Sequence, residues 1–237
     1  MLKLKGFLTS FKNLPFIQKS VRCISSKLSY SSNNTSGLNL IGVTVRDALN
    51  DVSIKKPNDI CYKFCMTNKT YSFIELKHRV DEISQSLLNM GFVKGDRLAI
   101  MLPNLPETVE TILAAASIGV VVVLMNPAYQ VVEVEHMLKK TRAKGIVLID
   151  QLKTIRQYEM LKTICPELEH SQKGELNSLR LPDLKHVIMT KLIPNSAKFN
   201  GTWLFSDIQN YSSSSYQLPY VDVDDPLALL FTSGSTG

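Results

Sequence analysis

The sequence predicts an α/β protein in which a mostly parallel sheet is flanked by helices on both faces. Two observations support this class. Short apolar runs such as Val120–Leu124 alternate with longer segments whose apolar residues recur every three or four positions. Gly and Pro separate these segments, as the short connections of βαβ units require. With 237 residues and 44% hydrophobic content, the chain can bury a full core.

The first elements have clear boundaries. We expect a helix over 43–50, a strand over 60–66 and a brief return strand at Tyr71. Ser72 and Glu75 have the spacing of a capping box, in which each side chain satisfies a backbone N–H of the other. The helix that follows carries an apolar stripe and ends at Gly91; the stripe is Phe73, Leu76, Val80, Ile83, Leu87 and Met90.

Strand and helix patterns then alternate along the chain. Strands are expected over 98–102, 120–124, 145–150 and 186–190, and helices over 106–118, 131–142, 154–164 and 203–211. The first helix of this set opens with Pro106, which suits a first helical turn. The polar stretch 167–181 is expected to be irregular, because its apolar residues follow neither the helical period of 3.6 residues nor the strand period of two.

The last stretch carries the candidate site. Leu227–Phe231, opened by Pro226, predicts a buried strand, and it leads directly into a loop of only Thr, Ser and Gly. Such a loop offers backbone N–H and hydroxyl donors and no negative charge, which suits a phosphate. A polar turn at a strand end is the ordinary alternative. The loop is not the nucleotide-binding G-x-x-x-x-G-K-[ST], because no Lys follows it in this sequence.

The net charge of +6 resides in the first 36 residues. This leader contains six Lys or Arg residues and no acidic one, and without it 21 basic residues balance 21 acidic ones. We therefore expect no nucleic-acid partner. Residues 1–36 predict a mitochondrial transit peptide and linker, with a processing site near Ile24; a disordered basic tail is the alternative.

No metal site or membrane span is expected. The Cys and His residues are scattered, and the pair Cys61 and Cys65 lacks further ligands nearby. The uncharged run from Thr111 to Met125 is shorter than the about 20 residues that a spanning helix needs. Helix followed by strand in a buried core explains that run better.

The terminal loop, together with an ordered set of short segments, resembles the adenylate-forming enzymes, which include acyl-CoA synthetases, luciferases and peptide-synthetase adenylation domains. The resemblance covers about 44–237. The segments that carry it are Tyr71–Phe73, Lys94–Leu98, Leu102–Asn104, Asn126–Gln130, Leu138–Lys140, Ile164–Glu167, Arg180–Leu184 and Phe231–Gly237. Combined with the leader, they look most like the mitochondrial medium-chain acyl-CoA synthetases.

The resemblance implies an incomplete N-terminal AMP-binding domain, truncated at its phosphate loop, and an ATP- and Mg-dependent ligase. A fatty acid would be adenylated and then transferred to CoA, in the mitochondrial matrix, with a homo-oligomer left open. The residues implied to bind the ATP phosphates are Thr232, Ser233, Gly234, Ser235, Thr236 and Gly237. The family's catalytic and metal-binding residues would all follow Gly237, so we expect no catalytic or metal residue here.

On this reading residues 1–237 alone should be inactive. The alternative is a non-catalytic truncated isoform that acts as a binding or interaction module. A different phosphate-binding α/β enzyme is a weaker possibility, because unrelated matches would have to fall in family order.

Overall fold

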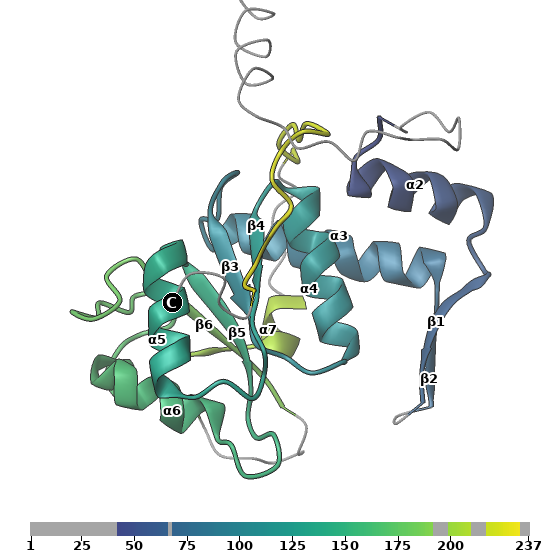
Figure 1. The fold of residues 1–237 in the computed structure, drawn as a ribbon. Coiled ribbons are helices and arrows are strands. Elements are labelled where there is room, and N and C mark those ends of the chain that lie inside the picture. The colour runs from purple at the N-terminus through teal and green to yellow at the C-terminus, as the bar shows by residue number, and fades with distance from the viewer. Residues whose placement is uncertain (1–41, 66–67, 192–198, 210–216, 233–237) are drawn as a thin grey trace, which may run out of the picture. The chain divides into compact units, whose positions relative to one another are not determined.

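The computed structural model describes residues 42–65, 68–191, 199–209 and 217–232 (Figure 1). Residues 42–237 form one compact unit. The expected transit peptide, 1–36, lies outside the described residues.

The described part begins with a helix and a hairpin. Helix α2, Val45–Lys55, is capped by Thr44, whose hydroxyl accepts from the backbone N–H of Asp47. It therefore extends beyond the predicted 43–50. Strands β1, Ile60–Phe64, and β2, Lys69–Ser72, pair antiparallel in a separate two-stranded sheet.

Helix α3, Phe73–Asn89, confirms the predicted capping box. The Ser72 hydroxyl accepts from the N–H of Glu75 at 3.3 Å, and the Glu75 carboxylate accepts from the N–H of Ser72 at 2.8 Å. Five residues of the predicted stripe are buried: Leu76, Val80, Ile83, Leu87 and Met90. The end of α3 continues into Gly91 at φ +83°, a left-handed conformation that costs Gly nothing.

The main sheet has six strands in the order β7-β6-β5-β3-β4-β8, and every pairing in it is parallel. The predicted parallel α/β class is confirmed. The strands are β3 Arg97–Ile100, β4 Val121–Leu124, β5 Gly145–Ile149, β6 His186–Thr190, β7 Trp203–Leu204 and β8 Ala228–Leu230. The remaining helices are α4 Pro106–Ser117, α5 Val131–Thr141, α6 Gln157–Ile164, the 3-10 turn η1 Pro166–Glu169 and α7 Phe205–Gln209.

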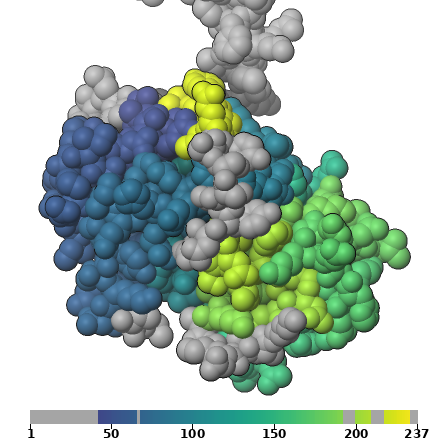
Figure 2. All heavy atoms as spheres, turned by 180° about the vertical axis from the view of Figure 1, so that it is seen from behind, coloured from purple at the N-terminus to yellow at the C-terminus, as the bar shows by residue number. Residues whose placement is uncertain are grey.

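Helices cover both faces of the sheet (Figure 1). One core cluster joins alternate strand residues such as Val123 and Met189 to α5 and α6. The other joins the opposite set, such as Val122 and Ile188, to α3, α4 and α7. Figure 2 shows the short yellow-green α7 lying beside the blue residues of α3. Burial on both faces explains why these strands are continuous apolar runs.

The segment Gly95–Arg97, which leads into β3, joins distant elements. The Arg97 guanidinium donates to the carbonyls of Thr141 and Arg142 at 2.7 and 2.6 Å and so caps the C-terminus of α5. The Asp96 carboxylate pairs with Lys144 at 2.6 Å. These contacts fix the turns at the amino ends of β3 and β5.

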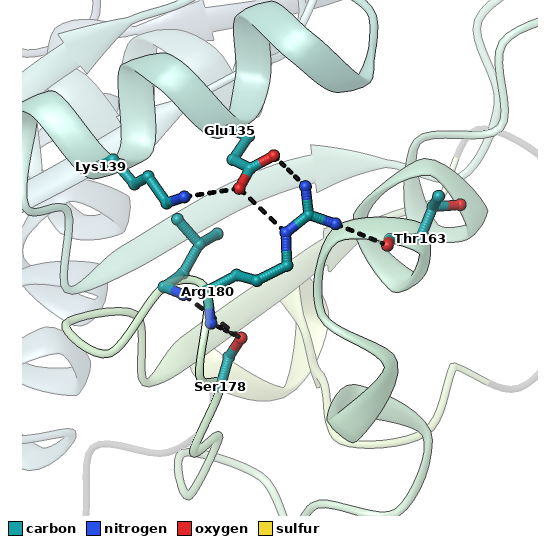
Figure 3. Close-up of polar contacts among 6 residues, drawn as sticks. Glu135, Lys139, Thr163, Ser178 and Arg180 are labelled. Carbon is teal, nitrogen blue, oxygen red and sulfur yellow. Dashed lines mark hydrogen bonds and ion pairs between the residues drawn. The ribbon is translucent and has the colours of Figure 1, made fainter.

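The excursion between α6 and β6 is irregular, as predicted, but it is anchored. Leu168 and Leu176 are fully buried. In Figure 3, Arg180 lies between α5 and α6: its guanidinium pairs with the Glu135 carboxylate and donates to the Thr163 carbonyl. Lys139 pairs with the same carboxylate at 2.7 Å.

A buried ion pair joins α3 to α4. Glu110 has no solvent exposure, and the Arg79 guanidinium forms a bidentate contact with its carboxylate. Burial raises the pKa of Glu110, while the hydrogen bond and the charge of Arg79 oppose that shift. Tyr71 lies under the same guanidinium, with its ring centre 5.6 Å from Arg79 Cζ.

Two predicted elements differ from the structure. The helix expected over 203–211 begins with the short strand β7, because Trp203 and Leu204 pair with β6 before the helical turn starts. The helix expected from residue 154 begins only at Gln157, because Leu152 and Ile155 first form an isolated bridge. No helix in the described part of the chain is long and apolar enough to cross a membrane.

Candidate phosphate-binding edge

Strand β8 leads the chain to the carboxyl edge of the sheet. It pairs in parallel with β4, matching Val122 with Ala228 and Leu124 with Leu230. Thr232 therefore emerges beside the loop that follows β4, at the edge where ligands of parallel sheets bind. Its side chain is exposed. The other expected phosphate ligands, Ser233, Gly234, Ser235, Thr236 and Gly237, lie outside the described residues and remain a prediction.

The prediction of a buried strand over Leu227–Phe231 is wrong in its burial. The strand is shorter, and Leu229 and Leu230 are 39% and 70% exposed. Among the described residues β8 pairs only with β4, so it is an edge strand whose outer side has no neighbour. Phe231 alone is half-buried, where it packs against the cluster under α5 and α6.

The loop after β4 leaves the sheet at the same edge as Thr232, because Leu124 pairs with Leu230. The Asn126 side-chain oxygen accepts from the N–H of Ala128 at 2.9 Å, which fixes a tight Asx turn. Gln157 is fully buried and holds this turn from behind. Its amide nitrogen donates to the Pro127 carbonyl at 3.0 Å, and its oxygen accepts from the N–H of Ile149 at 2.9 Å. One side chain thus ties the loop after β4 to the end of β5.

Two cations hold the segment that precedes β8. Arg46 of α2 donates to the carbonyls of Ser117 and Pro219, both at 3.0 Å. Lys94 pairs with the Asp225 carboxylate at 2.5 Å and donates to the Tyr220 carbonyl at 3.3 Å. The position of residues 219–225 therefore depends on two side chains that lie far from them in the sequence.

Asp225 also closes its own turn. Its carboxylate accepts from the N–H of Asp222 at 2.6 Å, and its N–H donates to the Asp222 carbonyl at 3.1 Å. The Lys94 hydrogen bond, followed by the Asp222 N–H, lowers the pKa of Asp225. The carboxylate is thus ionised at neutral pH, and the turn before β8 is set by charge and hydrogen bonds rather than by burial.

The described part of this edge suits a phosphate. Thr232 provides an exposed hydroxyl at the carboxyl edge. No group of three His, Cys, Asp or Glu side chains among the described residues could hold a metal ion. Among the described residues, the structure identifies no group that would bind Mg or CoA.

Sequence reasoning missed the residues that support this edge. Gln157 reads as one polar residue in a helix, and Arg46 and Lys94 read as surface charges. Gln157 lies 30 positions from Pro127 in the sequence, and Arg46 lies 173 positions from Pro219. Lys94 and Asp225 are 225 − 94 = 131 positions apart. No local pattern signals contacts over such separations.

The fold and this edge define a class of protein. A family profile described as AMP-binding enzyme matches residues 50–237. The chain belongs to this family, which confirms the resemblance to adenylate-forming enzymes.

Curated relatives lie within the same family. The chain is 38% identical over 217 residues to the Mus musculus protein named medium-chain acyl-CoA ligase ACSF2, mitochondrial, covering 89% of this chain and 34% of the relative. It is 40% identical over 173 residues to the Homo sapiens protein of that name, covering 70% of this chain and 27% of the relative. The chain spans about a third of the length of the curated relatives it matches.

Solved structures share the fold. An anthranilate CoA ligase, AuaEII, in complex with anthranoyl-AMP aligns with a TM-score of 0.66 at 16% identity, over 86% of this chain and 35% of the other. Acetoacetyl-CoA synthetase from Streptomyces lividans aligns with a TM-score of 0.64 at 22% identity, over 83% and 29%. At these identities the likeness shows the fold alone.

Proposed function

We propose that this chain is part of a mitochondrial acyl-CoA ligase that activates a fatty acid, with medium-chain acids as its substrates. The 38% identity to a relative named as a medium-chain acyl-CoA ligase carries the proposal. The leader of residues 1–36 and the relative's mitochondrial name support import into the matrix.

The proposed reaction has two steps. The fatty-acid carboxylate attacks the α-phosphate of ATP, which forms an acyl-adenylate and releases pyrophosphate. The CoA thiol then attacks the acyl carbon, which forms the thioester and releases AMP. Both steps bring anionic groups together, so catalysis depends on donors that neutralise phosphate charge. Mg bound with ATP would supply further neutralisation.

Thr232, Ser233, Gly234, Ser235, Thr236 and Gly237 are proposed to hold the β- and γ-phosphates of ATP. Two observations support this: Thr232 lies at the carboxyl edge, and the match to the AMP-binding family extends through Gly237. Arg46, Lys94 and Gln157 then act as positioning residues, because they fix the segments on either side of the loop.

The test of the loop is Gly234→Val in the full-length ligase, measured by ATP–pyrophosphate exchange. A branched side chain would obstruct the approach of the backbone to phosphate, so we expect exchange to fall by about 100-fold or more. Gly42→Val is the matched control, because a Cβ at Gly42 meets no atom within 4 Å. Equal exchange by the two variants would refute the assignment of the loop.

We further propose that residues 1–237 alone do not form acyl-CoA. The relatives are about three times as long as this chain. The measurement is thioester formation by the 237-residue chain beside the full-length ligase at equal concentration. Activity of the shorter chain would place the catalytic groups within it and overturn this proposal.

A further inference from the structure

A second cavity lies at the other end of the sheet's carboxyl edge. It has a volume of about 160 Å³ and lies where β6 and β7 end and where α4 and α7 begin. Four strand spacings separate β6 from β8, so the cavity lies about 19 Å across the sheet from the strand that leads to Thr232. It is therefore a separate site.

Thr190 provides a buried hydroxyl in this cavity. The residue is 3% exposed, and its Oγ1 has no hydrogen-bond partner among the described residues. Nearly all buried polar side-chain atoms in folded proteins have such a partner. The Thr190 hydroxyl can therefore accept a hydrogen bond from, or donate one to, a molecule that enters the cavity.

The alternation of side chains along β6 decides which groups face the cavity. Ile188 lies in the cluster under α3 and α4, and Met189 lies in the opposite cluster. Thr190 therefore faces α4. Lys191 also lines the cavity, but its side chain extends toward the other face. The ammonium of Lys191 confirms this direction, since it lies 5.7 Å from the ring centre of Phe199, which packs on the α5–α6 side.

Glu107 gives the cavity its charge. This half-buried residue in the first turn of α4 lines the cavity, and its carboxylate forms no ion pair or hydrogen bond with a described residue. Three positions further on, the Glu110 carboxylate is paired with Arg79. The Glu107 charge lacks such a cation, and its repulsion contributes to the raised pKa of Glu110. Leu204 and Phe205 supply apolar walls.

We propose that this cavity binds a primary alkylammonium group. The ammonium donates hydrogen bonds to the Glu107 carboxylate and to Thr190 Oγ1, and the alkyl part lies against Leu204 and Phe205. An anion is disfavoured by Glu107, and a neutral alcohol would satisfy Thr190 but leave the carboxylate without a counter-charge. A free amine and the side chain of a partner's lysine share this chemistry.

The first experiment uses n-propylammonium chloride, 1-propanol and sodium propionate as probes on the 237-residue chain. The readout is the NMR shift of the Thr190 methyl group at pH 7 and constant ionic strength. We expect saturable binding of propylammonium, binding of propanol at least about tenfold weaker, and none of propionate. Binding of propanol as tight as propylammonium, or no saturation with propylammonium, would overturn the proposal.

A second probe distinguishes the two sources of the ammonium. Nα-acetyl-lysine methylamide carries the same group on a blocked amino-acid backbone. Its binding at the same site would identify a lysine side chain as an acceptable occupant. Binding of propylammonium without the lysine derivative would restrict the cavity to free amines.

Three variants complete the test. Thr190→Val keeps the side-chain shape, and Glu107→Gln removes the charge; each should weaken propylammonium binding at least about tenfold. Glu133→Gln is the control, since Glu133 is an exposed carboxylate in the first turn of α5. Thr190→Val should melt at the same or a higher temperature without ligand, because it removes an unpartnered hydroxyl. Unchanged binding in Thr190→Val and Glu107→Gln would refute the site.

Discussion

Acidification should destabilise this protein through one histidine, His186. The residue begins β6, is 6% exposed, and packs against the Phe92 ring with centres 5.1 Å apart. Its Nδ1 has no hydrogen-bond partner among the described residues. Burial, and then the charge of Lys144, lower the pKa of His186 from 6.5 to about 4, and Asp96 opposes them only partly.

The magnitude follows from that difference in pKa. In the unfolded chain the imidazole takes up a proton below pH 6.5, whereas in the folded chain it does so only near pH 4. The stability is therefore fully present above pH 6.5 and is lost as the pH falls toward 4. With about 1.4 kcal/mol per pKa unit, His186 costs about 3 kcal/mol of the free energy of unfolding across this window.

Urea unfolding at a series of pH values measures this effect. His186→Gln removes the titrating imidazole while keeping a polar side chain of similar size. The carboxylates and the other histidines then contribute equally to the pH dependence of the wild type and of the variant. The free energy of unfolding of the wild type should fall below that of the variant by about 3 kcal/mol more at pH 4 than at pH 7. Parallel curves, or an imidazole that titrates near 6.5 by NMR in the folded protein, would refute the reasoning.

Three further changes test the fold. Gly201→Ala places a Cβ 2.5 Å from the Leu168 carbonyl at φ +67°, so it should lower the free energy of unfolding by about 2 kcal/mol in urea titrations. Glu110→Gln leaves Arg79 without its counter-charge and should lower the free energy of unfolding by about 3 kcal/mol. Arg142→Ala breaks an exposed ion pair and should lower it by under about 1 kcal/mol, so equal losses would contradict the role of burial. Leu230→Lys places a charge on the exposed edge of β8 and should reduce self-association, which analytical ultracentrifugation measures. An unchanged sedimentation profile would show that self-association does not depend on this edge.

Local patterns predicted the elements that depend on neighbouring residues. The Ser72–Glu75 box and the stripe of α3 are signals within one helix, and the structure confirms both. Strand β7 has only two residues, so no periodicity could reveal it. The role of Arg97 as the cap of α5 joins residues 44 and 45 positions apart, which no local window includes.

Burial of the last strand could not be predicted for a different reason. An apolar run shows that a strand can be buried, but its actual burial depends on which elements cover it. The run at Leu229 has the composition of a central strand, yet β8 has a described neighbour on one side only. Apolar sequence therefore overestimates burial wherever the covering element is not part of the same local pattern.

The position of the candidate loop consequently depends on contacts other than the core. Before β8, Lys94 and Arg46 hold the chain through an ion pair and backbone carbonyls. Along β8, the parallel ladder with β4 sets the register, and after it Phe231 packs beside the loop after β4 that Gln157 supports. Such polar contacts specify geometry more than they add stability, because exposed ion pairs contribute little free energy. Thr232 is thus placed accurately by a strand that is itself weakly buried.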